Sequence, residues 1–162
     1  MKTQKEAIKI IKKLKEYYPE ATCSLDFASP FEMAISVMLS AQCTDERVNK
    51  TTPELFKIAN TPEQMCQLKL EEIEKILACS QMLVEKYNGI VPNDMENLQK
   101  LPGIGRKSAN VIMLEAFNNP QGIAVDTHAK RISNKIGLSL ESDPEKIEKD
   151  LLKILPQETY YD

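Results

Sequence analysis

Start and stop signals for α-helices recur along the whole chain, whereas no segment shows the alternating pattern of a β-strand. Ser29-Pro30-Phe31-Glu32 and Thr61-Pro62-Glu63-Gln64 each place a hydroxyl residue three positions before a Glu or Gln, with proline at the first helical position. This is the pattern of a capping box. Asn88-Gly89 and Gly137 supply left-handed helix stops. The sequence therefore predicts an all-α fold of about nine or ten helices joined by short links.

The individual helices follow from these signals and from apolar residues at helical spacing. The first predicted helix, residues 3–17, has one apolar face made of Ala7, Ile8, Ile11 and Leu14. Residues 31–39 are apolar around most of the helix surface, which predicts the buried centre of the domain. The other predicted helices are 44–60 with a candidate break at Pro53, 70–87, a short helix capped by Asn93 and Glu96 and ending near Lys100, 106–117, a helix capped by Asp126 and ending near 136, and 144–155.

The composition is that of an ordinary globular protein, with 42% hydrophobic and 28% charged residues. No apolar run approaches the length of a membrane span, and the first residues lead into a charged segment rather than the core of a signal peptide. A chain of 162 residues can form one domain or two small lobes that share a core. We therefore expect a cytoplasmic protein.

The four cysteines, Cys23, Cys43, Cys66 and Cys79, are spread through the first half of the chain with no close pair. Their spacing fits neither a zinc knuckle nor an iron–sulfur motif. We expect reduced, mostly buried thiols and no metal site formed by them.

Positive charge is concentrated in one part of the chain. The formal net charge is −3, which argues against DNA binding by bulk electrostatics. Residues 100–135, however, hold six cations and only two anions, a local net charge of +4. A basic face on an acidic body is typical of a local contact with a polyanion, and a solvated surface is the alternative.

Two glycines separated by one residue follow a proline in Leu101-Pro102-Gly103-Ile104-Gly105-Arg106-Lys107, between two predicted helices. Glycine permits a tight turn with positive φ and a close approach of the backbone. The N–H groups and the positive dipole end of the second helix point at whatever occupies the turn. The natural ligand is an anion, such as a DNA phosphate, and a plain corner between helices is the alternative.

Lys107 has two interpretations. An ordinary lysine has a pKa of about 10.4 and would contact a phosphate or solvent. A nucleophilic lysine must be neutral, and Arg106, the helix N-terminus and partial burial would each lower its pKa. Such an amine could attack an electrophilic sugar carbon, displace a base and form a Schiff base.

A carboxylate near that lysine would stabilise positive charge developing on the sugar and assist proton transfer. Asp126, in Val125-Asp126-Thr127-His128, is the candidate, although its position alone favours an ordinary helix N-cap. His128 is the only histidine and is interpreted as a structural or phosphate-facing residue.

Several sequence blocks, in this order, carry a resemblance to a known family. They are Ser29-Pro30-Phe31-Glu32, Leu39-Ser40-Ala41-Gln42-Cys43-Thr44-Asp45, Asn88-Gly89-Ile90-Val91-Pro92, Leu101–Asn110 and Val125-Asp126-Thr127-His128. Together they resemble endonuclease III, a family of helix-hairpin-helix DNA glycosylases that are also abasic-site lyases. The resemblance covers essentially the whole chain and implies a two-lobed helical glycosylase fold. Residues 1–162 would form a single unit, with lobe 1 at about 22–118 containing the hairpin 93–117, and lobe 2 formed by 1–21 and 119–162.

The resemblance also implies an activity. The protein would be a monomeric, bacterial-type, nucleoid-associated base-excision repair enzyme that removes flipped-out oxidised pyrimidines from duplex DNA and cleaves the abasic site by β-elimination. Lys107 would be the Schiff-base nucleophile and Asp126 the catalytic carboxylate. The residues implied to contact DNA are Gln42, which would enter the gap left by the extruded base, and Gly103, Ile104, Gly105, Arg106, Lys107, Thr127 and His128. Related adenine glycosylases usually lack the lysine and carry a glutamate where this chain has Ser36. Both differences favour an enzyme that is a glycosylase and an abasic-site lyase.

Two departures from the family's pattern keep alternatives open. The family's [4Fe–4S] segment, with four closely spaced cysteines, follows the helix that matches 144–155, and none of the four cysteines lies there. A cluster is expected only if a further segment supplies the ligands. About a dozen residues of a helix–loop–helix that bears a DNA-wedging side chain are also absent, because 71–75 runs straight into Ile76. The alternatives are a catalytically weakened or inactive DNA-binding remnant and a monofunctional glycosylase.

Overall fold

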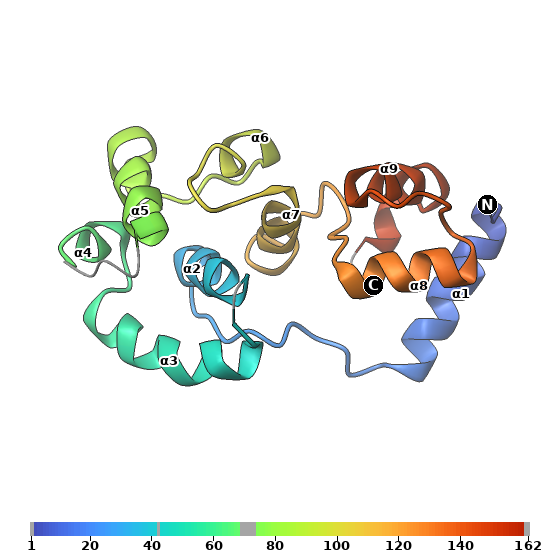
Figure 1. Cartoon of the computed structure of the whole chain (residues 1–162), viewed down its shortest axis with the longest axis horizontal. Helices are drawn as coiled ribbons and strands as arrows, with labels where there is room; N and C mark the ends of the chain where they lie inside the picture. The colour runs from blue at the N-terminus through green and yellow to red at the C-terminus, as the bar shows by residue number, and fades with distance from the viewer. Residues whose placement is uncertain (1, 42, 69–73, 161–162) are drawn as a thin grey trace. The chain divides into compact units, whose positions relative to one another are not determined.

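The computed structural model of the chain describes residues 2–41, 43–68 and 74–160, and every regular element in these ranges is helical (Figure 1). The elements are α1 (Gln4–Tyr17), α2 (Pro30–Ser40), α3 (Asp45–Ile58), α4 (Pro62–Met65), α5 (Glu74–Tyr87), α6 (Met95–Leu98), α7 (Arg106–Glu115), α8 (Thr127–Ile136), α9 (Pro144–Ile154) and the 3₁₀ helix η2 (Gln157–Thr159). The predicted all-α fold is confirmed. No helix within the described ranges is long and apolar enough to cross a membrane.

The helices belong to two compact units. Unit 2, Cys23–Asn118, contains α2 to α7, and unit 1, Met1–Thr22 with Asn119–Asp162, contains α1, α8 and α9. These boundaries lie close to the lobes expected from the resemblance. That the two units work as one glycosylase unit stays a prediction.

The core of unit 2 is built around α2. Every residue from Phe31 to Val37 is buried, and Met33, Ala34 and Ile35 are fully inaccessible. The helix packs against α3 and α7. The prediction of a buried central helix is therefore confirmed, and its cause is the nearly continuous apolar surface.

The core of unit 1 joins α1, α8 and α9. Its buried residues are Ala7, Val125, Leu138, Ile147, Leu151, Ile154 and Leu155. The predicted face of α1 is only partly right, because Ile10 and Ile11 pack with Ala7 against this core while Leu14 remains 38% exposed. The exposure of Leu14, Tyr17 and Tyr18 shows that the last turn of α1 contributes little to the core.

The two predicted capping boxes form only in part. The Ser29 hydroxyl accepts from the Glu32 N–H at 3.1 Å, as predicted. The Glu32 carboxylate, however, accepts from the N–H of Ala28 at 2.7 Å rather than from that of Ser29. In the same way, Gln64 accepts from the N–H of Asn60 at 3.0 Å, one residue before the N-cap. The longer side chain reaches back past the cap in both places, which the reciprocal pattern does not predict.

Two helix boundaries also correct the prediction. Pro53 lies inside α3 and does not break it, so the loss of one backbone hydrogen bond is tolerated within this helix. The short helix α6 is capped by Asp94 rather than Asn93, because the Asp94 carboxylate accepts from the Asn97 N–H at 2.8 Å. The predicted helix start at Leu70 lies outside the described residues.

Candidate nucleic-acid interface

The hairpin between α6 and α7 is fixed to the core of unit 2 by its apolar residues. Leu98 is fully buried, Leu101 is 2% exposed and Ile104 is 4% exposed. The N–H of Ile104 donates to the Leu101 carbonyl at 3.1 Å, which closes the turn. Ile104 therefore offers neither its side chain nor this N–H to a ligand. Its predicted part in DNA binding stays a prediction.

The two hairpin glycines have different conformations. Gly103 has a φ of 85°, in the left-handed region that favours glycine. Gly105 has φ −91° and ψ −179°, which is extended backbone open to any residue. The prediction of positive φ is therefore right for Gly103 and wrong for Gly105. A Cβ placed on Gly105 would meet no atom within 4 Å, so its backbone borders open space.

The N-terminus of α7 has no side-chain cap, because its N-cap residue is Gly105. The helices α2, α3, α8 and α9 each begin with a hydroxyl or carboxylate that accepts a hydrogen bond from the first turn. At α7 a ligand can take that place, since the first-turn N–H groups carry the positive end of the helix dipole. An uncapped helix start next to open space is a site suited to an anion.

Lys107 occupies the first turn of α7 and its side chain is exposed. The partial burial expected to help activate this lysine is therefore not found. Arg106, the first residue of α7, is half-buried beside it. Both cations lie in the first turn of α7, where they would neutralise a bound phosphate.

Asp126 is the N-cap of α8, and its Oδ1 accepts from the Ala129 N–H at 2.7 Å. The carboxylate is half-buried, whereas Thr127 and His128, the first two residues of α8, are exposed. The prediction that Asp126 caps the helix is thus confirmed. Its catalytic role stays a prediction. Asp126 belongs to unit 1 and Lys107 to unit 2.

Residues 35–157, most of the chain and including the hairpin and Asp126, match the family described as HhH-GPD superfamily base excision DNA repair protein. This chain belongs to that family. Endonuclease III of Synechocystis sp. is 42% identical to it over 169 aligned residues, which cover 95% of this chain and 77% of the relative. Endonuclease III of Escherichia coli is 41% identical over 165 residues, which cover 93% of this chain and 78% of the relative.

The HhH-GPD fold of the chain also matches solved structures. A non-covalent endonuclease III–DNA complex has a TM-score of 0.91 at 40% identity, and covers 99% of this chain and 82% of that one. A trapped endonuclease III–DNA covalent intermediate has a TM-score of 0.92, also at 40% identity and with the same coverage. A thermostable thymine-DNA glycosylase, at 18% identity and a TM-score of 0.73, shares the fold.

This HhH-GPD chain is shorter than its relative within the region where the two align. The 169 aligned positions with the Synechocystis protein exceed the 162 residues of the chain, so that protein has residues within the aligned region that this chain lacks. Gln42, predicted to enter the gap left by a flipped base, lies outside the described residues. Its role stays a prediction.

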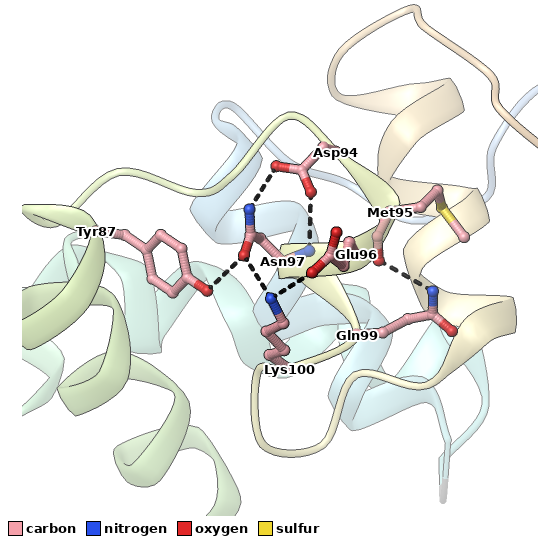
Figure 2. A network of polar contacts seen from close by, with 7 residues as sticks. All are labelled: Tyr87, Asp94, Met95, Glu96, Asn97, Gln99 and Lys100. Carbon is pink, nitrogen blue, oxygen red and sulfur yellow. Dashed lines mark hydrogen bonds and ion pairs between the residues drawn. The ribbon is translucent and has the colours of Figure 1, made fainter.

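A polar network anchors the first helix of the hairpin motif to α5, and Figure 2 shows Asn97 at its centre. The Asn97 side chain donates to Asp94 at 3.0 Å and accepts from the Tyr87 hydroxyl at 3.2 Å. It also accepts from Lys100 at 3.2 Å. These bonds join the end of α5 to both ends of α6 and so position the entry to the hairpin. Sequence analysis missed the network because no local pattern connects Tyr87 to Asn97.

The same network corrects the local charge count. Lys100 Nζ lies 2.8 Å from Glu96 Oε1, and this ion pair raises the pKa of Lys100. Glu96 lies just before the segment 100–135 that was counted as basic. With the pair cancelled, the segment has a net charge of +3. The other two cations of the hairpin, Arg106 and Lys107, lie in the first turn of α7.

The cysteines are free, but they are less buried than expected. Only Cys79 is buried, Cys23 and Cys66 are half-buried, and Cys43 is exposed. Burial raises the pKa of the Cys79 thiol to about 12, so this residue serves the core. Within the described residues, no group of three or more His, Cys, Asp or Glu side chains could hold a metal ion.

Proposed function

We propose that this chain excises oxidised pyrimidines from duplex DNA and then cleaves the resulting abasic site through a Schiff base on Lys107. The observation that carries the proposal is the uncapped N-terminus of α7, which borders open space at Gly105 and holds Lys107 in its first turn. The endonuclease III relatives at about 40% identity support the reaction class.

DNA would first be held through its backbone. A phosphate at the hairpin would accept from the first-turn N–H groups of α7 and be neutralised by Arg106 or Lys107. Thr127 and His128, exposed at the start of α8, would contact the backbone as well. Contacts of this kind are independent of sequence, as a repair enzyme requires. Selection of the damaged base would come from the lower cost of flipping it out of the stack.

The chemistry would use the two predicted catalytic side chains. The Lys107 amine would attack C1′ of the sugar as the glycosidic bond breaks and the base departs. Asp126 would stabilise the positive charge that develops on the sugar and accept the proton lost by the amine. Asp126 would return this proton to O4′ as the C1′–O4′ bond breaks, which opens the sugar ring and leaves a protonated Schiff base between Lys107 and C1′. Loss of a C2′ proton would then expel the 3′ phosphate, and water would hydrolyse the Schiff base to release Lys107. DNA seated on the hairpin would cover Lys107, which is exposed without it.

A second candidate is a DNA-binding protein with weak or no catalysis. It is favoured by the exposure of Lys107 and by the residues that the aligned relatives have and this chain lacks. Such a protein would keep salt-sensitive duplex binding through the hairpin without releasing a base. A monofunctional glycosylase is the third reading, in which water would replace Lys107 as the nucleophile.

One assay separates the three. The full chain is incubated with a labelled duplex that contains a single ring-saturated pyrimidine, and products are analysed with and without alkali treatment. The proposed function predicts strand cleavage without alkali. Cleavage that appears only after alkali would identify a monofunctional glycosylase. Strands that stay intact with and without alkali, while the duplex is still bound, would identify a DNA-binding protein without catalysis.

A further inference from the structure

A row of lysines covers the solvent side of α1. Between residues 2 and 13 the chain carries five lysines and a single carboxylate, Glu6. Lys5, Lys9, Lys12 and Lys13 are all exposed, and we refer to these four residues as the lysine face. The opposite side of α1 is held against the core of unit 1 by Ala7, Ile10 and Ile11. Packing therefore fixes the direction in which the lysine face points.

The lysine face lacks the ion pairs that some other lysines make in the structure. Lys50, Lys57 and Lys153 each lie within 3.2 Å of a carboxylate three or four residues earlier. Among the residues that the structure describes, no carboxylate lies within ion-pair distance of any member of the lysine face.

The sequence explains this lack of partners. The residue four positions before Lys9 is Lys5, and the residue four positions before Lys13 is Lys9. Helix α1 also has two carboxylates. Glu6 is turned toward the helix start, where it accepts from the Thr3 N–H at 2.8 Å. Glu16 follows Lys12 by four residues and Lys13 by three, but it forms no ion pair with either of these two lysines.

This arrangement works against the stability of the helix itself. Like charges at i and i+4 lie side by side on a helix and repel one another. Lys5, in the first turn, also opposes the helix dipole. Lys2, Lys9 and Lys13 line a hollow of about 210 Å³ together with Glu6 and Ile10. A polyanion lying along the lysine face would relieve the repulsion and neutralise several charges at once.

We propose that the lysine face binds the phosphate backbone of duplex DNA, as a contact separate from the hairpin. A membrane surface fits less well, because a helix bound at the membrane interface needs an apolar side exposed along its length. Ala7, Ile10 and Ile11 of α1 pack in the core, and its large exposed apolar side chains, Leu14 and Tyr17, lie in the last turn. Duplex DNA requires only positive charge, since each lysine that neutralises a phosphate releases a counterion. The contact belongs to unit 1 and does not depend on Lys107 or on any catalytic step.

The test compares two charge-matched variants of the full chain. Lys5→Gln, Lys9→Gln and Lys13→Gln are combined in one variant, and Lys146→Gln, Lys149→Gln and Lys153→Gln in the control. The control lysines lie on α9 of the same unit, and both variants lose the same charge. Binding to an undamaged duplex is measured across a range of salt concentrations. Each lost phosphate contact makes the slope of log K against log salt less negative by about 0.9.

The lysine-face variant is expected to lose roughly two to three units of this slope, while the control keeps the wild-type slope. Equal slopes in the wild type and the lysine-face variant would overturn the proposal. So would equal losses in both variants, which would reflect net charge alone. Loss of binding to anionic phospholipid vesicles with an unchanged duplex slope would assign the face to membranes instead. Base release is also measured for the wild type and the control variant, so failure of the proposed function would be seen separately.

Discussion

At the scale of single residues, Asp94 shows how closely the approach to the hairpin is held. Its carboxylate caps α6 by accepting from the Asn97 N–H, and it accepts a second bond from the Asn97 side chain. These two bonds hold the pKa of Asp94 below its ordinary value of 3.8. An ionised Asp94 is therefore bound more favourably in the folded chain than in the unfolded one.

Asp94→Ala is expected to lower the free energy of unfolding by about 1 kcal/mol at neutral pH, as for other lost N-caps. Asp94→Asn is expected to cost less, because asparagine also caps helices. Since the folded pKa is lowered, the ionised carboxylate stabilises the wild type above the ordinary pKa of 3.8, and this contribution is lost as pH falls below it. Urea unfolding at several pH values measures both effects. If the difference in the free energy of unfolding between the wild type and Asp94→Asn is the same at pH 3 and pH 7, the stabilising role of the ionised carboxylate is contradicted.

At the scale of elements, the hairpin separates a glycine that shapes the turn from one that leaves room for a ligand. Gly103 needs positive φ, whereas Gly105 has extended backbone beside open space. From the sequence pattern alone, positive φ would be expected to explain the glycine at both positions. Local signals correctly predict the caps at Ser29, Thr61 and Asp126, because each cap depends only on neighbours in the chain. They could not locate the bond from Tyr87 to Asn97 or the exposure of Lys107, which depend on how helices pack.

The two glycines are expected to respond differently to alanine. Gly103→Ala should lower the free energy of unfolding by about 1–2 kcal/mol, the cost of a side chain in the left-handed region. Gly105→Ala should change stability less, because its Cβ would meet no atom. Gly105→Ala should nevertheless weaken duplex binding, since the new methyl group would occupy the approach of the phosphate. Urea unfolding and duplex binding are measured on both variants. If Gly105→Ala binds the duplex with wild-type affinity, the proposal that a DNA phosphate lies against this turn is contradicted.

At the scale of the whole molecule, the predicted catalytic pair is divided between two units that are built differently. Unit 2 supplies Lys107 on a helix packed against the buried centre, and unit 1 supplies Asp126 at the start of α8. The family, the all-α fold and the hairpin could all be predicted from short sequence blocks, because each block combines a turn with a helix start. The charge of the segment 100–135 does not predict the lysine face, because its four lysines lie outside that segment and become neighbours only on the surface of α1.

The central claim is that Lys107 forms a covalent bond to the sugar, and borohydride trapping on an abasic-site duplex tests it most directly. The wild type is expected to give a stable protein–DNA adduct, and Lys107→Ala none. Lys57→Ala is the control, a lysine of the same unit that is paired with Glu54, and it should trap like the wild type. Asp126→Asn, which keeps a capping side chain, should trap more slowly without losing the fold. An adduct that survives Lys107→Ala, or no adduct from the wild type, would contradict the claim.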